Sequence, residues 1–253
     1  MDVMASLSAQ NLRFGSGARE ILRGVSFDLF AGELVGLMGR NGAGKTSLLR
    51  ILLGLAHPQG GAVRISNVPL EDFSRPEIAA RIAYVPQVHL PTFPFTVHDI
   101  VQMGVRRRGR WPRRDPAVKD IVGEALERMG IGDLADRPCT TLSGGETQAM
   151  LISRALAQGA RIMVMDEPAA ALDPGQQQRL MRNLRELAGE GYTILFSVHQ
   201  FDLVRAWADR LLLLHGGNMV ADGSPAAVLQ NEMIDRCFGD GTSDQLGRSF
   251  GRS

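Results

Sequence analysis

Two kinds of hydrophobic pattern alternate along the chain. Alternating apolar and polar residues bounded by glycine predict strands at Leu7–Phe14 and Ile21–Phe30. Short continuous apolar runs predict buried strands, and apolar residues at three- or four-residue spacing predict helices. The expected buried strands are Glu33–Met38, Gly61–Ile65, Arg81–Val85, Ile162–Met165, Thr193–Val198 and a pair within Arg210–Val220. The expected helices outside the central region are Thr46–Leu55, Gln176–Ala188 and Phe201–Ala208.

The order of these elements predicts the fold class. Apolar strands that alternate with helices indicate a mainly parallel sheet with helices on both faces, an α/β fold. From Val88 to Ala157 the pattern changes to helices separated by loops rich in proline, glycine and arginine. The polar, glycine-rich end, Gly239–Ser253, predicts a poorly ordered tail.

Composition narrows the class of protein. Lys and Arg number 28 against 27 Asp and Glu, so no charge bias indicates a nucleic-acid partner. No apolar run approaches the ~18 residues that cross a bilayer, and the first residues lack a signal-peptide pattern. Cys139 and Cys237 lie far apart without metal-binding spacing, as is typical of thiols in a reducing cytosol.

A glycine-rich string, GRNGAGKT at 39–46, lies between a predicted strand and a predicted helix. This context predicts a phosphate-binding loop (P-loop), because glycines let backbone N–H groups surround phosphate oxygens at a helix N-terminus. Lys45 is expected on the β- and γ-phosphates and Thr46 on Mg²⁺. The predicted nucleotide-binding residues here are Gly39, Asn41, Gly42, Ala43, Gly44, Lys45, Thr46 and Ser47.

Two further strings carry candidate chemistry. The predicted strand Ile162–Met165 ends in Asp166, expected to hold Mg²⁺, and Glu167, expected to polarise an attacking water. LSGGE at 142–146 predicts a helix start capped by Ser143, with two glycines that allow close backbone approach. Taken alone, that segment is as readily a structural cap as a binding element.

Together these strings resemble the ABC ATPase family, from about Leu7 to Gly223. GRNGAGKT resembles its Walker A motif, RIMVMDE its Walker B motif with the catalytic glutamate, and LSGGE its signature motif. The resemblance implies a RecA-like P-loop core with a mainly parallel sheet (1–87 and 158–223), including an N-terminal antiparallel β subdomain. It also implies an inserted α-helical subdomain with the signature (88–157), and a C-terminal helix and flexible tail (224–253).

The resemblance gives roles to four more residues. Gln87 in YVPQ matches the Q-loop, which offers an amide oxygen to Mg²⁺ or water, and Asp173 matches the D-loop. His199 in SVHQ matches a switch histidine that orients water with Glu167 and senses the γ-phosphate. Phe14 falls where the family places an aromatic that stacks on adenine. From the residues alone, the histidine and Phe14 are more readily structural.

Some positions depart from the family pattern. Arg40 stands where proline or another residue is usual, TQAM follows LSGGE where many relatives have Gln-Arg-Gln, and Ala169–Ala170 replace Thr-Ser. None of these changes removes a catalytic group. We therefore expect an active ATPase with ATP and Mg²⁺ as its cofactors.

In this family, the signature motif of one subunit completes the ATP site of another. The resemblance thus implies a homodimer with two ATPs bound head to tail. Ser143, Gly144, Gly145 and Glu146 of one chain would approach the nucleotide of its partner. It also implies transmembrane permease subunits as partners, with this chain peripheral on the cytoplasmic face of the inner membrane.

The transported solute is indicated only by resemblance. The segment VHLPTFPFTVHDIVQMGVRRR at 88–108 and the FDLV string that follows SVHQ resemble importers of iron-siderophores, haem, cobalamin and molybdate. An iron chelate or related metal-containing solute, delivered by an external solute-binding protein, is therefore expected. The alternatives are an exporter subunit or a non-transport ABC ATPase, although the chain lacks the coiled coil, zinc cysteines or tandem cassette typical of the latter.

An arginine cluster follows, with six arginines and Trp111 in residues 106–114. It is either a solvated loop or a contact with anionic lipid headgroups beside the permease. One short basic patch in a nearly neutral chain is weak support for nucleic-acid binding. We therefore expect no nucleic-acid partner.

Overall fold

The computed structural model describes residues 4–17, 19–87, 95–105 and 116–239. Two sheets organise them, with strand orders β2-β1-β4-β5 and β10-β9-β3-β8-β7-β6. The strands are β1 Leu7–Ser16, β2 Arg19–Leu29, β3 Leu34–Met38, β4 Gly60–Ile65, β5 Val68–Pro69, β6 Ile82–Val85, β7 Ile162–Met165, β8 Thr193–Ser197, β9 Arg210–His215 and β10 Asn218–Gly223.

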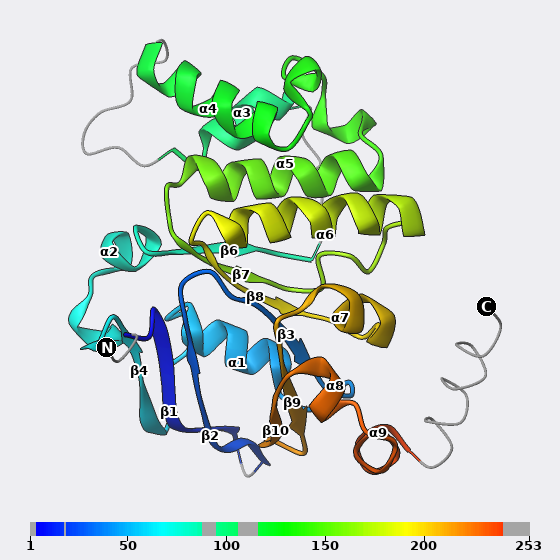
Figure 1. Ribbon diagram of the computed structural model, residues 1–253. Helices are drawn as coiled ribbons and strands as arrows, with labels where there is room; N and C mark the ends of the chain where they lie inside the picture. The colour runs from blue at the N-terminus through cyan, green and yellow to red at the C-terminus, as the bar shows by residue number, and fades with distance from the viewer. Residues whose placement is uncertain (1–3, 18, 88–94, 106–115, 240–253) are drawn as a thin grey trace, which may run out of the picture.

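Helices surround these sheets (Figure 1). They are α1 Lys45–Leu52, α2 Arg75–Ala79, α3 Val97–Gln102, α4 Pro116–Arg128, α5 Gly144–Ala157, α6 Pro174–Gly189, α7 Phe201–Trp207, α8 Pro225–Val228 and α9 Asn231–Phe238. Short 3₁₀ turns cover Leu70–Asp72, Gly132–Leu134 and Cys139–Thr141. Among the described residues, no helix combines the length and the apolar character that a bilayer crossing requires.

The six-stranded sheet confirms the predicted α/β class. Strand β3 pairs in parallel with β8 and β9, β7 pairs in parallel with β6 and β8, and only β10 joins in antiparallel fashion. Helix α6 covers one face of this sheet and α1 the other (Figure 1). The carboxyl ends of the parallel strands therefore lie along one edge, where open α/β sheets bind their ligands.

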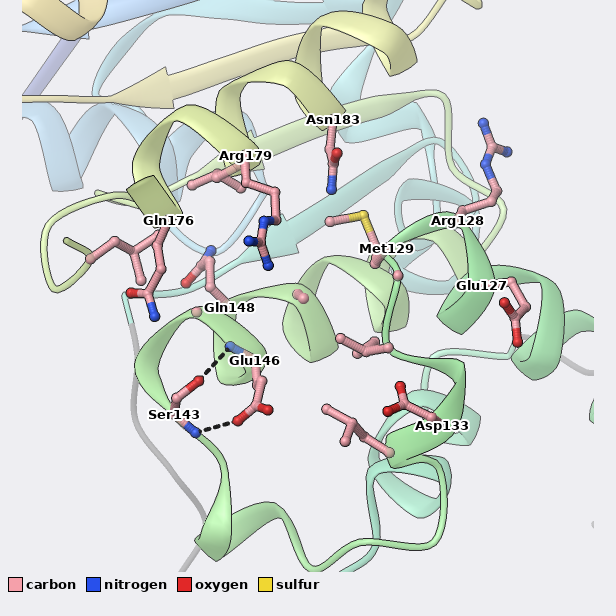
Figure 2. Close-up of a pocket in the computed structure, with 17 residues that line it drawn as sticks. Glu127, Arg128, Met129, Asp133, Ser143, Glu146, Gln148, Gln176, Arg179 and Asn183 are labelled. Carbon is pink, nitrogen blue, oxygen red and sulfur yellow. Dashed lines mark hydrogen bonds between the residues drawn. The ribbon is translucent and has the colours of Figure 1, made fainter. Parts of the chain in front are cut away.

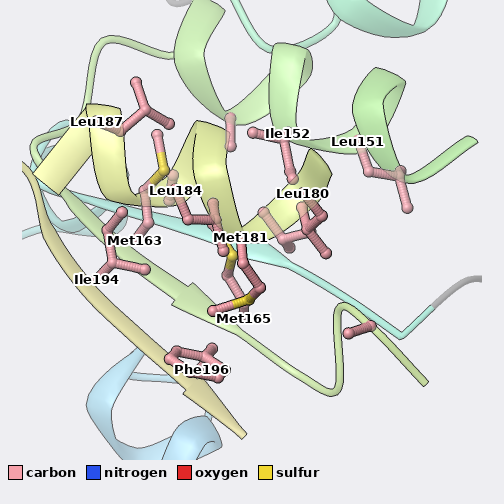
Figure 3. Packing of buried hydrophobic residues seen from close by; sticks show 14 of the residues in the cluster. Leu151, Ile152, Met163, Met165, Leu180, Met181, Leu184, Leu187, Ile194 and Phe196 are labelled. Carbon is pink, nitrogen blue, oxygen red and sulfur yellow. The ribbon is translucent and has the colours of Figure 1, made fainter. Parts of the chain in front are cut away.

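Strand β8 shows how the two faces are separated. Ile194 and Phe196 pack with Met165 and the side chains of α6 (Figure 3), whereas Leu195 belongs to the cluster that includes α1. Successive strand residues point to opposite faces. Ser197, which follows Phe196, therefore belongs to the α1 face, the same face as the P-loop.

The four-stranded sheet is the predicted N-terminal antiparallel unit. Strand β1 pairs in antiparallel fashion with both β2 and β4, and β4 pairs in the same way with β5. Leu7, Leu12 and Leu22 are completely buried and share a core cluster with Leu48 and Leu49 of α1. This sheet therefore packs against the helix that begins at the P-loop.

A helical layer of α3, α4 and α5 lies beyond α6 (Figure 1). One core cluster runs from Val97 and Val122 of this layer through Ile152 of α5 to the sheet residue Met163. Capping boxes begin α3 at Thr96 and α5 at Ser143. The inserted helical region is thus packed against the sheet through α5 and α6.

The sequence predictions of individual elements can be compared with the structure. The strand predicted at Ile162–Met165 coincides with β7, and the helix predicted at Gln176–Ala188 is α6, which begins two residues earlier. Helix α2 was not predicted, although Ser74 and Glu77 form a capping box at its start. The arginine cluster, residues 88–94 of the importer-like segment and the predicted tail beyond Gly239 lie outside the described residues.

Candidate nucleotide-binding and hydrolysis site

The P-loop connects β3 to α1, and glycine is required at its different positions for different physical reasons. Gly42 and Gly44 have φ angles of +80° and +107°, in the left-handed region that favours glycine. Gly39 has an ordinary φ, but a Cβ added there would lie 2.3 Å from the carbonyl oxygen of Leu214. The chain can therefore turn tightly into the N-terminus of α1 only with these residues.

Lys45 is the first residue of α1 and is only 7% exposed. Its Nζ donates a hydrogen bond to the carbonyl oxygen of Gly39 at 2.8 Å, which uses one of its three donors. Burial lowers the pKa of the ammonium group, while the nearby Glu167 and Asp166 carboxylates oppose that shift. A cation with remaining donors is thus held between the P-loop and the acidic strand end.

A cavity of about 490 Å³ opens over the P-loop, a volume typical of small-molecule sites. It brings together Asn41, Gly42, Gly44, Lys45, Thr46, Ser47 and Glu167, as the motifs predicted. Ser16, Arg19, Ile21 and Arg40 also line it. Because Arg19 at the start of β2 and Arg40 in the P-loop both add positive charge, the cavity is suited to a polyanion.

Besides the signature residues and Asp173, three residues predicted to bind nucleotide do not line this cavity. Ala43 is 5% exposed and packs in the core, and Gly39 lies beneath the loop against Leu214. Phe14 is partly buried against the core cluster shared by β1 and α1, while Ser16 and Ile21 line the cavity on that side. Adenine stacking by Phe14 therefore stays a prediction.

The acidic pair at the end of β7 is held in an unusual backbone conformation. Glu167 has a φ angle of +47°, in the left-handed region that residues other than glycine rarely adopt. Its backbone N–H donates to the Ser197 hydroxyl oxygen at 2.8 Å, and that hydroxyl donates to Asp166 Oδ1 at 2.7 Å. Ser197 of β8 therefore holds the Asp166 carboxylate and the Glu167 backbone.

The carboxylate of Glu167 contacts the other two residues that were predicted to be catalytic. His199 Nε2 lies 2.5 Å from Glu167 Oε1, and Gln87 Nε2 donates to Glu167 Oε2 at 3.4 Å. Glu167 follows β7, His199 follows β8 and Gln87 follows β6, so neighbouring parallel strands bring these groups together. A carboxylate fixed at both oxygens and facing a phosphate-binding cavity can orient a water molecule for in-line attack.

The residues that were predicted to hold Mg²⁺ supply oxygen donors. They are the Asp166 carboxylate, the Thr46 hydroxyl and the Gln87 amide, all hard ligands that suit this ion. Within the described part of the chain, no group of three or more histidine, cysteine or acidic residues forms a metal cage. Sites that combine one or two carboxylates with substrate phosphates are usual for Mg²⁺, so the donor set fits.

The signature segment LSGGE is, within its own chain, a satisfied helix start. Ser143 Oγ accepts from the backbone N–H of Glu146 at 3.3 Å, and Glu146 Oε2 accepts from the N–H of Ser143 at 2.7 Å. These hydrogen bonds, from the Ser143 backbone first and its side chain second, lower the pKa of the Glu146 carboxyl. Asp173 caps α6 similarly, since its Oδ1 accepts from the N–H of Gln176 at 2.9 Å.

A second cavity, of about 590 Å³, adjoins this segment between α4, α5 and α6 (Figure 2). Ser143, Gly145 and Glu146 line it, together with Arg179 and Gln148. No described residue of the P-loop lines this cavity, and no described signature residue lines the P-loop cavity. The two predicted halves of the nucleotide site are therefore separate within one chain.

Gln148 is a feature of the second cavity that sequence reasoning missed. It is 1% exposed, and neither atom of its side-chain amide has a hydrogen-bond partner among the described residues. Figure 2 shows Gln148 projecting from α5 toward α6, from which Gln176 and Arg179 project in return. The contact between these two helices thus contains a buried polar group that no described residue satisfies.

Comparison with known proteins identifies the family. The family model described as ABC transporter matches residues 22–170, more than half of the chain. The P-loop, the acidic strand end and the signature segment all fall within that match. The chain belongs to the ABC transporter family and is an ATPase subunit of that family.

Particular relatives are similar over most of their length. The hemin import ATP-binding protein HmuV of Nocardia farcinica is 39% identical over 89% of this chain and 78% of its own. The protein of the same name from Bordetella pertussis is 39% identical over 92% of both chains. A solved metal-chelate type ABC transporter in an inward-facing conformation is 31% identical with a TM-score of 0.81, covering 92% of this chain and 89% of its own.

Proposed function

We propose that this chain powers the import of a metal chelate, with haem as the first candidate, by hydrolysing ATP. The observation that carries the ATPase mechanism is that Lys45 and Glu167 line the P-loop cavity and that His199 contacts the Glu167 carboxylate. The choice of solute is supported by likeness alone, because the relatives above are named for hemin import and the solved neighbour for metal chelates.

In the proposed mechanism, backbone N–H groups of the P-loop and Lys45 bind the β- and γ-phosphates. Thr46, Asp166 and Gln87 would hold Mg²⁺, which would neutralise phosphate charge when bound. Glu167 orients the attacking water and accepts its proton, and His199 holds the Glu167 carboxylate in place. These groups are already assembled, so most of the catalysis is positioning and electrostatic stabilisation.

The second half of each site comes, in this proposal, from a second copy of the chain. The separation of the signature segment from the P-loop supports it, because Ser143, Gly144 and Gly145 cannot cap the nucleotide of their own chain in this arrangement. A solved dimeric bacterial ABC transporter cassette shares the fold, with 26% identity and a TM-score of 0.74. Closure of two chains would add backbone donors to the γ-phosphate, and hydrolysis would release them.

The remaining partners follow from the same proposal. Permease subunits would span the membrane, an external solute-binding protein would deliver the chelate, and this chain would work on the cytoplasmic face. The fold alone does not select import, since an ATP-bound bacterial exporter of the Atm1 family also matches with a TM-score of 0.78.

The test reconstitutes this chain in lipid vesicles together with permease subunits of a metal-chelate importer. Solute-binding protein is added empty, loaded with haem, or loaded with a ferric siderophore, and ATP hydrolysis is measured. Import of haem predicts that the haem-loaded protein stimulates hydrolysis most and that haem accumulates on the same side of the membrane as the ATPase. Stimulation without any binding protein, with solute leaving the ATPase side, would instead establish an exporter.

A further inference from the structure

Ser197, at the carboxyl end of β8, joins the two acidic residues of the site through a single hydroxyl. Its Oγ donates to Asp166 Oδ1 at 2.7 Å and accepts from the backbone N–H of Glu167 at 2.8 Å. Both lengths are within the normal range for hydrogen bonds of these types. The hydroxyl therefore acts as donor and acceptor at once, one bond to each member of the pair.

The fold directs this hydroxyl to its place. Strand β8 pairs with β7 through Met165 and Phe196, so Ser197 lies one step beyond the last paired position, level with the Asp166–Glu167 turn. Alternation along β8 sends Phe196 into the α6 layer and Ser197 to the opposite, P-loop face. The side chain is 1% exposed, so water does not compete for either hydrogen bond.

Each hydrogen bond has a separate consequence for the site. Because Asp166 Oδ1 is occupied by Ser197, the carboxylate is held in one orientation, with Oδ2 available for a metal ion. Because the N–H of Glu167 is also held, the left-handed conformation of Glu167 is stabilised at a residue that would otherwise avoid it. That conformation directs the Glu167 carboxylate to His199 and Gln87.

We propose that Ser197 is a positioning residue for ATP hydrolysis, whose hydroxyl sets the orientation of both Asp166 and Glu167. This inference rests on the proposed function, since it assumes that those carboxylates act on Mg²⁺ and on the attacking water. Ser197 itself touches neither substrate nor metal in the proposal. Partners that orient ligands in this way typically affect metal affinity or activity by about 10- to 100-fold when removed.

A packing role for Ser197 must be separated from this one. Ser197 also borders a cavity of about 150 Å³ next to Ala170 and Leu203, so a change of volume there could act without any hydrogen bond. Threonine and valine have the same shape and differ only in a hydroxyl and a methyl group. The pair Ser197→Thr and Ser197→Val therefore isolates the hydroxyl at constant volume.

The control is Thr193→Val, at the other end of β8. Thr193 is buried on the same strand, and its change removes a hydroxyl four residues from the site. Melting temperature checks folding, and steady-state hydrolysis separates kcat from KM. Binding of Mn²⁺ with ATP, followed by electron paramagnetic resonance, reports the metal site without turnover.

We expect Ser197→Val to lower kcat by about 10- to 100-fold and to weaken Mn²⁺ binding about 10-fold. Its KM for ATP should change less than about threefold, because the P-loop contacts remain. Ser197→Thr and Thr193→Val should stay within about threefold of the wild type in all three quantities. Equal values for Ser197→Val and Ser197→Thr would overturn the inference, whereas wild-type protein that neither binds Mn²⁺ with ATP nor hydrolyses it would overturn the proposed function as well.

Discussion

The two halves of the site differ in how their polar groups are satisfied. At the P-loop, groups from different elements contact one another: Lys45 with Gly39, Ser197 with Asp166, and His199 with Glu167. At the signature, Ser143 and Glu146 hydrogen-bond to each other within the first turn of their own helix, and Glu146 also pairs with Arg137 at 3.7 Å. In the proposed mechanism, the first half is a preassembled catalytic centre, and the second is a helix start that acts on a phosphate bound by another chain.

The same contrast extends to buried polar side chains. Ser197, beneath the catalytic half, has both its donor and its acceptor in use. Gln148, behind the signature half, has no partner for its side-chain donor or acceptor among the described residues, and it lies where α5 meets α6 beside a large cavity. The buried polar side chain at the phosphate-binding half is thus fixed by hydrogen bonds, whereas the one at the signature half is not.

The largest expected effect is on hydrolysis. Glu167→Gln should lower the rate of ATP hydrolysis by at least about 100-fold, because the water loses its general base. It should also accumulate an ATP-bound dimer, since the γ-phosphate that joins the chains is no longer removed. Light scattering after size exclusion measures the dimer, and Glu186→Gln on the exposed side of α6 is the control. A variant that stays monomeric at saturating ATP and Mg²⁺ contradicts the two-chain site.

The next largest effect distinguishes the P-loop half of the site from the signature half, by comparing nucleotide binding with hydrolysis. Lys45→Ala should weaken nucleotide binding to the single chain about 10- to 100-fold, because it removes a charged donor to phosphate. Ser143→Arg should leave that binding within about twofold and yet abolish hydrolysis, since it blocks only the contact with a second chain. Isothermal titration calorimetry on dilute protein measures binding, and phosphate release measures hydrolysis. Equal losses of binding in both variants would mean that one chain forms the whole site.

A smaller effect concerns stability at the signature half. Gln148→Met should raise the free energy of unfolding by about 1–2 kcal/mol, because it removes a buried amide without partners and keeps the volume. Gln177→Met is the matched control, since the Gln177 Nε2 donates to the carbonyl oxygens of Ala169 and Leu172 at 3.1 Å each. That control should lose stability in urea titrations. A loss in both variants would show that Gln148 is already satisfied.

The smallest effect depends on pH. The pKa of Glu146 is lowered from its ordinary value of 4.5 by hydrogen bonds from Ser143. A lowered carboxyl pKa contributes stability that is fully present above the unfolded value and is lost as pH falls through the folded value. Urea midpoints of wild type and Glu146→Gln should therefore differ by a constant amount above about pH 5 and converge below pH 4.5. A difference that stays unchanged down to pH 3 contradicts this account of the cap.

The sequence allowed the catalytic half to be predicted because its chemistry is local in the chain. The glycine-rich loop is recognised because Lys45 stands at a fixed position in it. The buried strand that ends in two acidic residues is likewise recognised from consecutive residues, without knowledge of tertiary contacts. Gln87 and His199 were found only through resemblance, and the structure brings both to Glu167. The buried strands are short, continuous apolar runs in the sequence, so the bounds of β7 were predicted correctly.

Other features depend on which residues meet across strands and helices. Ser197 is an unremarkable serine in a strand pattern, and its role requires the register between β7 and β8. Arg19 lines the P-loop cavity from the start of β2, about 20 residues before the P-loop in sequence. Gln148 looks like an ordinary polar residue of an amphipathic helix, and only the packing of α6 buries it.

The measurement that tests the central claim most directly is an ATP-dependent cross-link between two differently tagged copies of the chain. One copy carries Ser143→Cys and the other Asn41→Cys in the P-loop. Both also carry Glu167→Gln to retain ATP, and Cys139 and Cys237 are replaced by alanine. With ATP and Mg²⁺, a short bifunctional maleimide should give a covalent pair that contains one copy of each tag, and very little without nucleotide. The absence of mixed pairs at saturating ATP, with the protein shown to have bound it, would contradict a site shared between two chains.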